Sequence, residues 1–268
     1  MTDFLGIARE RVYSPGKVED DRAILDAVAT RLAADARVAV ISADDPLPAD
    51  SPAPLVFAMC QGPAALDRLR TWEGAGVRVI NSVAGIENAH RRRMLAAFAR
   101  DAVPHPQSAI VATGDGVALP AWVDEGAWLK RGDVHATEPD DVMRVANRTA
   151  ARAGLARFAQ RGISAACVQR HIEGDVIKFY AVRERGFFAA FGADGAPPRL
   201  DVATRDAMQR AAEAAAAALQ LEVFGGDCVR DHDGGLWIID LNDWPSYGRC
   251  RFPASEAIAS YVRQARPS

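Results

Sequence analysis

Hydrophobic and polar positions follow two alternating periods along the first 82 residues. Short apolar runs have the composition of strands, and the stretches between them space their apolar residues as a helix does. Because strands that alternate with helices build parallel sheets, this part predicts a small α/β domain. The expected strands are residues 4–8, 38–41, 55–59 and 77–80, and the expected helices are residues 20–33 and 64–75.

Beyond Ser82 the pattern changes, and extended and helical segments alternate irregularly. Residues 87–100 have the spacing of a basic amphipathic helix, which the prolines at 104 and 106 end. Strands are expected at 127–130, 167–172 and 176–182. The chain as a whole is therefore expected to be α/β, with its parallel sheet confined to the N-terminal part.

A hairpin is predicted over residues 223–242, whose sequence is V-F-G-G-D-C-V-R-D-H-D-G-G-L-W-I-I-D-L-N. Residues 223–230 and 236–241 have strand character, and the Asp233-Gly234 step between them is a strong turn signal. With a two-residue turn or a four-residue loop, Asp227 lies opposite Asp240. A three-residue loop would break this register.

Two opposed aspartates need a compensating charge. Directly opposed side chains have Cβ atoms about 4.5 to 5.5 Å apart, and like charges placed that way are destabilising. Strand alternation puts Ile238, Asp240 and Asn242 on one face, opposite an apolar face of Trp237, Ile239 and Leu241. Carboxylates and an amide carbonyl suit Mg²⁺, which completes its coordination with water and phosphate oxygens. Asp231, His232 and Asp233 are interpreted as turn residues.

Two lysines on strands add candidate phosphate contacts. Lys178 shares a strand face with Val176 and Tyr180, and a buried ammonium must be paired or must contact a bound anion. The alternative is an edge strand with Lys178 in solvent. Lys130, at the end of its strand, could hold a phosphate or be a solvated strand end. Residues 13–17, Y-S-P-G-K, are interpreted as a Pro-Gly turn, because a phosphate loop needs a further glycine and a Ser or Thr after the lysine.

Composition narrows the function classes. The chain has 268 residues, of which 49% are hydrophobic and 25% charged, as in globular proteins of one or two domains. A formal net charge of -3 and a pI near 6.0 argue against a general nucleic-acid binder. No run approaches the roughly 20 apolar residues that span a membrane. The four cysteines form no C-x-x-C pair, so we expect neither a zinc knot nor a disulfide framework, and a reducing, cytoplasmic setting.

The order of these features resembles the ATP-grasp superfamily from about Asn81 to the C-terminus. The set comprises a basic helix, a strand-borne lysine, a Gln-x-x-Ile hinge strand followed by Glu173, a basic residue in the next strand, and an aspartate followed by a terminal D-x-N. The carboxylate–amine ligases of the glutathione synthetase and ribosomal-protein glutamate ligase type are the most similar branch. The resemblance implies an N-terminal domain of residues 1–82 followed by a two-lobed grasp module, with lobes of residues 83–167 and 168–268.

The resemblance also implies an activity and a set of site residues. The expected enzyme uses ATP and Mg²⁺, with Mn²⁺ as an alternative and two ions bound, to convert a carboxylate into an acyl phosphate that an amine attacks. A small-molecule kinase is the alternative, and a nucleotide-binding module without catalysis is the third class. A homodimer is left open. The implied residues are Arg91 or Arg93 and Lys130 for the phosphates, Gln169, Arg170, His171, Ile172 and Glu173 for the adenosine, Lys178 for the transferred phosphate, and Asp227, Asp240 and Asn242 for the metal.

Two segments depart from the superfamily pattern. The phosphate-covering loop is usually rich in glycine, whereas residues 131–135 here read R-G-D-V-H. After the metal motif, residues 243–249 replace the small-residue turn seen in many ligases of this group. We expect the second segment to face the acceptor substrate, with Tyr247 and Arg249 as candidates for an acidic group, Arg249 being a candidate catalytic residue. A surface turn packed by Trp244 is the alternative.

Overall fold

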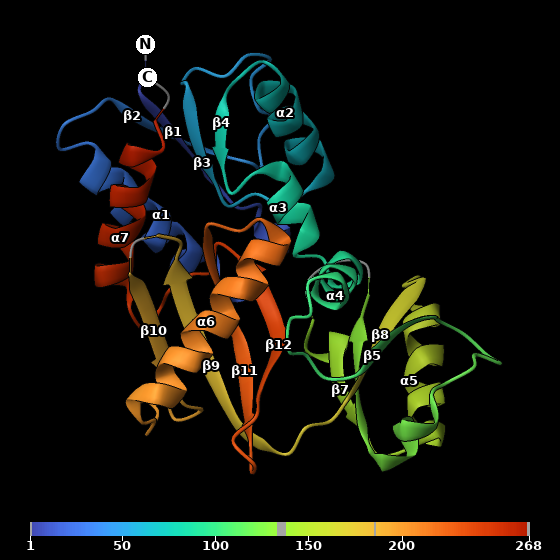
Figure 1. Cartoon of the computed structure of the whole chain (residues 1–268). Helices are drawn as coiled ribbons and strands as arrows, with labels where there is room; N and C mark the ends of the chain where they lie inside the picture. Colours follow the sequence, from blue (N-terminus) through green and yellow to red (C-terminus); the bar gives the residue numbers. More distant parts are fainter. Residues whose placement is uncertain (1, 133–137, 185, 267–268) are drawn as a thin grey trace.

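The structure is a computed structural model that describes residues 2–132, 138–184 and 186–266. In this part of the chain, three four-stranded sheets form, and Figure 1 shows them as an upper unit and two lobes below it. The phosphate-covering segment at Asp133, Val134 and His135 lies outside the described residues. None of the described helices is long and apolar enough to cross a membrane.

The N-terminal sheet is parallel, as its alternating pattern predicts. Its strand order is β2-β1-β3-β4, and a separate hydrophobic cluster covers each face. The observed ends differ from the predicted ones by two residues or fewer. The strands are β1 (Phe4–Ala8), β2 (Val38–Ser42), β3 (Leu55–Ala58) and β4 (Arg78–Ile80), and the helices are α1 (Val18–Leu32) and α2 (Pro63–Gly74), with a short 3-10 turn η1 (Arg11–Tyr13) between β1 and α1.

The single helix predicted over 87–100 is wrong. The chain forms α3 (Val83–Asn88) and α4 (Arg91–Arg100), with His90 in an extended conformation between them. The two segments are buried in different places: Ile86 packs in the N-terminal cluster, whereas Met94 and Phe98 pack in the cluster of the third sheet. One straight helix cannot serve both cores, so the chain turns at His90 and starts α4 with Arg91.

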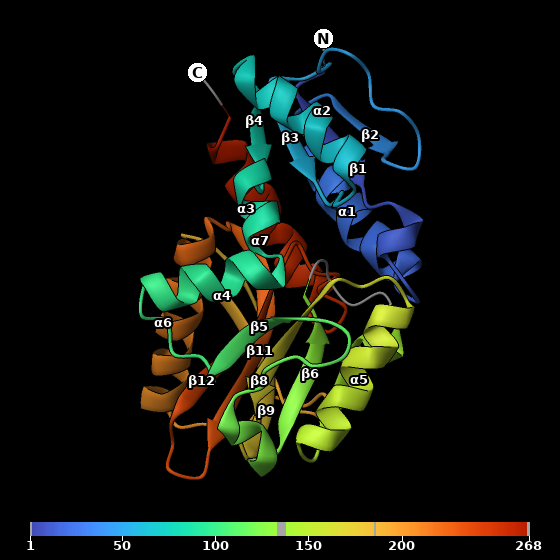
Figure 2. The ribbon, with the colours of Figure 1, turned by 90° about the vertical axis from the view of Figure 1, so that its right-hand side faces the viewer.

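The second sheet is antiparallel and has the order β5-β8-β6-β7. Helix α5 packs on it through a cluster that includes Leu129, Leu155 and Phe158. Figure 2 shows this lobe in front, with α5 along one side. Its elements are β5 (Ser108–Ala112), β6 (Ala127–Arg131), β7 (Val142–Val145), α5 (Arg148–Gln160) and β8 (Ala165–Arg170), with the 3-10 turns η2 (Ala121–Glu125) and η3 (Pro139–Asp141).

The third sheet, with the order β10-β9-β11-β12, carries the predicted hairpin. Strand β9 pairs with β10 on one side and with β11 on the other, so the edge-strand alternative for Lys178 is wrong. Helices α4 and α6 cover one face through a shared hydrophobic cluster. The elements are β9 (Gly174–Val182), β10 (Phe187–Phe191), α6 (Val202–Leu219), β11 (Val223–Asp231), β12 (Leu236–Asp243) and α7 (Arg251–Gln264).

One hydrophobic cluster joins the N-terminal sheet to the third sheet. It contains residues of β1 and β3 together with Tyr180, Val223 and Trp244, and helix α7 packs beside α1 in it. Figure 1 shows α7 returning to the upper unit. Strand β8 runs through the predicted limit between residues 167 and 168. The division into domains of residues 1–82, 83–167 and 168–268 remains a prediction. The shared hydrophobic cluster holds the N-terminal sheet against the third sheet.

The hairpin reaches the predicted pairing by a different route. Its loop consists of His232, Asp233 and Gly234, closed by the Asp231 N–H donating to the Gly235 carbonyl over 2.9 Å. The three-residue loop shifts the strand pairing by one residue from the predicted register, so that Cys228 pairs with Ile238. A bulge then shifts the pairing back by one residue, because Asp227 pairs with Asp240 and Ile239 is left over. Asp227 and Asp240 are therefore opposite each other, as predicted.

The bulge also overturns the predicted faces of β12. Ile238 does not share a face with Asp240, because the additional residue, Ile239, interrupts the alternation. Ile238 and Leu241 lie together in the hydrophobic cluster under α6 and are almost fully buried. The polar face keeps Asp240 and Asn242, and the bulge separates them from the apolar hairpin positions.

Gly226 allows β11 and β12 to approach at this point. A Cβ at Gly226 would overlap the Asp240 carbonyl oxygen and lie 2.8 Å from Phe179 Cζ. We therefore expect Gly226→Ala to lower the free energy of unfolding by about 1–3 kcal/mol in urea denaturation, because the Asp240 backbone on one side and the buried Phe179 ring on the other must move. Gly74→Ala, at a helical site with nothing within 4 Å of an added Cβ, is the control. Equal unfolding midpoints for the two variants would refute the close-contact argument.

Candidate active site

A charged row crosses three neighbouring strands of the third sheet. Lys178 on β9 pairs with Asp227 on β11, which pairs in turn with Asp240 on β12. The next row on the same face consists of Tyr180, Gly225 and Asn242. Because Gly225 has no side chain, Tyr180 and Asn242 border an open space. The fold thus gathers Lys178 and the three predicted metal ligands on one sheet face.

Asp227 is paired across the sheet with Lys178. The Lys178 Nζ lies 2.9 Å from Asp227 Oδ1, and both side chains are partly exposed. Burial by itself would lower the pKa of Lys178, but the Asp227 carboxylate and its hydrogen bond raise the pKa above the usual lysine value. Lys178 therefore stays cationic at neutral pH, and its charge offsets part of the repulsion between the two aspartates.

Two further cations face this row from other elements. Lys130, at the end of β6, is 6% exposed and donates to Gln169 Oε1 over 2.7 Å and to the Ile239 carbonyl over 3.1 Å. Arg91, the first residue of α4, is also 6% exposed, and its Nη1 lies 3.5 Å from Asp240 Oδ1. The chain therefore places two nearly buried cations beside the bulge in β12.

The protein by itself compensates these two buried cations poorly. In the described part of the chain, Arg91 Nε and Nη1 have no hydrogen-bond partner although both atoms are buried. Burial, followed by the neighbouring Arg91 charge, lowers the pKa of Lys130 to about 8. Unsatisfied buried donors and a destabilised ammonium indicate that an anion completes the arrangement.

The donor set fits a hard divalent cation. Asp227 and Asp240 are opposed carboxylates with side chains 23% and 25% exposed, and Asn242 is two residues beyond Asp240 on the same strand. No group of three or more His, Cys, Asp or Glu residues suited to a metal occurs in the described ranges. Two carboxylates and one amide leave open coordination positions, which suits Mg²⁺ with phosphate oxygens rather than zinc.

Four of the predicted hinge residues, Arg170 to Glu173, lie around a separate cavity of 650 Å³ between the second and third sheets, whereas Gln169 is buried beside Lys130 and does not line it. We call it the hinge cavity. The His171 ring accepts a hydrogen bond from Trp128 Nε1 over 3.0 Å and lies 2.9 Å from the Glu173 carboxylate. Asp231 Oδ1 accepts from the Asp233 and Gly235 N–H groups over 3.1 and 2.6 Å, which confirms its role in the turn, and its Oδ2 accepts from Trp237 Nε1 over 2.7 Å. The cavity is lined by His105, Gln107, Arg170, His171, Ile172, Glu173, Asp231, His232, Asp233 and Trp237.

Three other candidates have different surroundings. Arg93 is half exposed and pairs with Glu87 over 2.8 Å, so Arg91 and not Arg93 reaches the charged row.

Tyr247 is fully buried, and its hydroxyl lies 2.7 Å from the Ala181 carbonyl and 3.0 Å from the Phe224 carbonyl. Arg249 is exposed, donates to the Gly192 carbonyl over 3.0 Å and lies over Phe191. Tyr247 is therefore a core residue, which corrects its prediction as an acceptor ligand.

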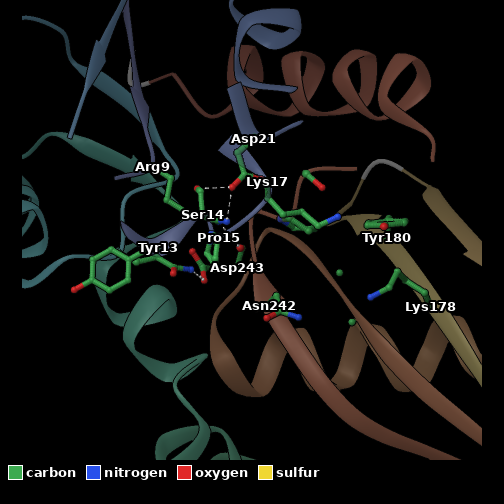
Figure 3. A pocket seen from close by; sticks show the side chains of 15 residues that line it. Arg9, Tyr13, Ser14, Pro15, Lys17, Asp21, Lys178, Tyr180, Asn242 and Asp243 are labelled. Atoms are coloured by element: carbon green, nitrogen blue, oxygen red, sulfur yellow. Dashed lines mark hydrogen bonds and ion pairs between the residues drawn. The ribbon is translucent and has the colours of Figure 1, made fainter. Parts of the chain in front are cut away.

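A second cavity adds residues that the sequence reading missed. It has a volume of 340 Å³ and lies between the N-terminal unit and the charged face (Figure 3). We call it the interdomain cavity. Arg9 and Gln61 line it just beyond β1 and β3, and Lys17 lines it from the Pro-Gly turn. The sequence could have indicated Arg9 and Gln61, because they follow predicted parallel strands and ligands bind at the carboxyl ends of such strands. No sequence pattern indicated Lys17, which was interpreted as part of a turn.

Comparison with known proteins gives structural matches. No protein-family model matches the chain, and no curated protein matches it either. An ATP-grasp RimK domain protein from Sphaerobacter thermophilus is 18% identical, with a TM-score of 0.70 over 97% of this chain and 99% of that one. The D-cycloserine synthetase DcsG is 21% identical, with a TM-score of 0.68 over 97% and 99%.

A further match spans nearly the full length of both chains. The D-alanine–D-alanine ligase from Bacillus anthracis, solved with ATP, is 11% identical, with a TM-score of 0.74 over 99% of each chain. Likeness at such low identity concerns the fold, and it agrees with the parallel sheet followed by two antiparallel lobes. The chain therefore has the ATP-grasp fold.

Proposed function

We propose that the chain is an ATP- and Mg²⁺-dependent ligase that joins a small carboxylate to an amine and releases ADP and phosphate. The observation that carries the proposal is the meeting of Arg91 and Lys130, two nearly buried cations, with the row of Lys178, Asp227 and Asp240. The unsatisfied donors of Arg91 and the destabilised ammonium of Lys130 favour a bound anion, and the opposed carboxylates favour a cation. Metal-bound nucleotide phosphate supplies both.

Two reaction steps follow from this assignment. A carboxylate oxygen attacks the γ-phosphorus of ATP, the bond to the β–γ bridging oxygen breaks, and ADP leaves. The amine nitrogen then attacks the acyl carbon, the bond from that carbon to the phosphate oxygen breaks, and the nitrogen loses a proton as the amide forms. Lys178, Lys130 and Arg91 would stabilise the negative charge on the transferring group, which is where most catalysis of phosphoryl transfer arises.

The chain's own residues divide the remaining work. Asp227, Asp240 and Asn242 would hold Mg²⁺, which neutralises charge on the phosphate oxygens when bound. The segment Gln169, Arg170, His171 and Ile172 would line the adenine in or beside the hinge cavity, with Glu173 facing adenine or ribose. Two ions, a cytoplasmic location and Arg249 as an acceptor contact belong to the same proposal.

Structural neighbours support a ligase over the kinase alternative. Those named above include a D-cycloserine synthetase and a D-alanine–D-alanine ligase. The interdomain cavity beside Lys178 contributes only two further basic side chains, Arg9 and Lys17, from the described residues. A polyphosphorylated alcohol would need more cations than these, because each phosphate carries about two charges.

Hydroxylamine trapping tests the proposal directly. The protein is incubated with ATP, Mg²⁺ and a panel of small acids, and ADP release and hydroxamate are measured together. An acyl phosphate gives a hydroxamate with the acid of the correct pair, whereas a phosphorylated alcohol gives none. ADP release that depends on an alcohol and yields no hydroxamate would establish the kinase instead.

Lys130 predicts a proton linkage to nucleotide binding. Its pKa of about 8 in the free protein rises when phosphate oxygens surround the ammonium, so binding takes up a proton and weakens as pH increases above 8. Calorimetry at pH 8 in two buffers of different ionisation enthalpy should show uptake of about half a proton. Lys130→Met should abolish the uptake. Equal uptake in both proteins would remove Lys130 from the phosphate site.

A further inference from the structure

The interdomain cavity adjoins the charged row, and the N-terminal unit and the third sheet with the segment after it share its wall about equally. Lys178 belongs to both the charged row and the cavity wall, and Tyr180, Gly225 and Asn242 of the next row also line the cavity. A volume of 340 Å³ is at the small end of ligand sites, which favours a compact substrate rather than a peptide chain. The wall consists of Arg9, Tyr13, Ser14, Pro15, Lys17, Asp21 and Gln61 from one side, and Lys178, Tyr180, Gly225, Gly226, Asn242, Asp243, Pro245 and Ser246 from the other.

Most charges in this wall are already paired within the protein. Arg9 Nη1 lies 3.1 Å from Asp21 Oδ2, and Ser14 Oγ donates to the same oxygen over 2.7 Å. The remaining Arg9 nitrogens donate to main-chain carbonyls, including that of Trp244 over 2.9 Å. Asp243 Oδ1 accepts from Gln61 Nε2 over 2.8 Å. These contacts tie the N-terminal unit to the end of β12, and they occupy every guanidinium nitrogen of Arg9.

Lys17 differs from its neighbours. It is exposed, and its ammonium has no hydrogen-bond or ion-pair partner among the described residues. The turn that presents it has Gly16 at φ +66°, a conformation that glycine adopts readily, and Lys17 precedes the first turn of α1. Two carboxylates in the first turn of α1 are paired with residues other than Lys17: Asp21 pairs with Arg9, and Asp20 pairs with Arg251. The Lys17 charge is therefore available to the cavity.

Lys17 and Lys178 enter this cavity from different parts of the fold. Figure 3 shows Lys17 on the N-terminal side, and Lys178 beside Tyr180 on the sheet side. Lys178 is held by Asp227 next to the phosphate site, so it meets the reacting end of a substrate. Lys17 has no such partner. A substrate that spans the cavity thus places a second group against an unpaired cation.

We propose that Lys17 is a specificity residue that binds an anionic group, a carboxylate, of the small substrate at a distance from its reacting atom. This inference rests on the proposed function for the identity of the reacting end. The anchored carboxylate belongs either to an acid with two carboxylates or to an amine that also carries one. Both sources present the same chemistry to Lys17, and a charge-assisted hydrogen bond to a lysine is the contact they share.

The test uses the full chain with ATP and Mg²⁺ and compares matched probes. Malonate, succinate and glutarate are compared with their monoamides as acids, and α-amino acids are compared with their amino amides as amines, with ADP release as the readout. If the monoamides have a higher KM than the diacids, the acid is the anchored substrate. If the amino amides have a higher KM than the amino acids, the amine is the anchored substrate. Preference for the neutral member in both arms overturns the proposal.

Variants then assign the effect to Lys17. With the preferred pair, Lys17→Met should raise KM for the anionic substrate by about 10- to 100-fold and leave kcat and the KM for ATP within about threefold, as expected for a charged hydrogen bond. Lys17→Arg should restore most of the affinity. Arg11→Met removes a cation from the neighbouring 3-10 turn, outside the cavity, and should change nothing. An unchanged KM in Lys17→Met refutes the role.

Failure of the ligase reaction can be separated from failure of this inference. If no pair of acid and amine makes the wild-type protein release ADP, the proposed function is refuted. Calorimetric titration of L-aspartate, succinate and glutarate into the protein then still measures anion binding in the cavity. Binding that Lys17→Met weakens at least tenfold supports the anion site by itself. Absence of binding by all three probes, or binding that Lys17→Met leaves unchanged, overturns it.

Discussion

Asp240→Asn is expected to lower ATP turnover by on the order of 10³-fold, because the proposed metal site would lose one of its two carboxylates. Asparagine keeps the size of the side chain and removes its charge. The measurement is kcat for ADP release at saturating ATP and Mg²⁺, followed by a Mn²⁺ titration. We expect the variant to need far more metal for any remaining activity.

The fold of this variant should remain intact. Asp240 is 25% exposed, and neutralising it removes repulsion from Asp227 while it weakens the ion pair with Arg91. These effects oppose each other, so we expect the free energy of unfolding to change by less than about 1 kcal/mol. Asp206→Asn, an identical charge change at an exposed position on α6, is the control and should keep full activity. A folded Asp240→Asn enzyme with normal turnover would end the metal assignment.

Lys178→Met is expected to reduce kcat by on the order of 10²-fold and to leave the KM for ATP within about threefold. The reason is the place of Lys178 in the row. Its ammonium pairs with Asp227 before metal and substrate bind, and its contact with the transferred phosphate would become strongest as charge develops there. Rapid-mixing measurement of the first turnover separates this chemical step from product release.

The conservative variant checks the charge argument. Lys178→Arg keeps a cation that can reach both Asp227 and a phosphate, so it should retain at least about a tenth of the kcat. Lys178→Met also removes the partner of Asp227, which increases repulsion between the aspartates and should strengthen metal binding rather than weaken it. Equal losses of ATP binding and rate in Lys178→Met would make Lys178 a nucleotide contact only.

The hairpin shows how far sequence reasoning could reach. The opposition of Asp227 and Asp240 follows from strand pattern and turn signal, and the structure confirms it. The route was wrong, since a three-residue loop and a bulge at Ile239 replace the regular pairing. A bulge depends on what the strand packs against. Here Ile238 and Leu241 both enter the core under α6, and local sequence does not contain that information.

The break between α3 and α4 has a similar cause. Residues 87–100 have a continuous helical pattern, yet the chain turns at His90 because Ile86 of α3 and Met94 of α4 are buried in different clusters. That turn makes Arg91 the first residue of α4 and brings it near Asp240, whereas Arg93 pairs with Glu87. The sequence left Arg91 and Arg93 as alternatives. Only the packing of two cores distinguished them.

By itself, the sequence determined the fold class, the parallel N-terminal sheet and the opposition of Asp227 and Asp240, because periodicity and hairpin pairing are local properties with short-range rules. The pairing of β9 with β11, which sets Lys178 beside Asp227, is not local. The tertiary structure alone decided the rest. It placed Lys130 and Arg91 beside the row, buried Tyr247 in the core, and brought Lys17 from a Pro-Gly turn to a cavity shared with Lys178. These contacts join residues far apart in sequence, and a packed core, rather than any local pattern, fixes their distances.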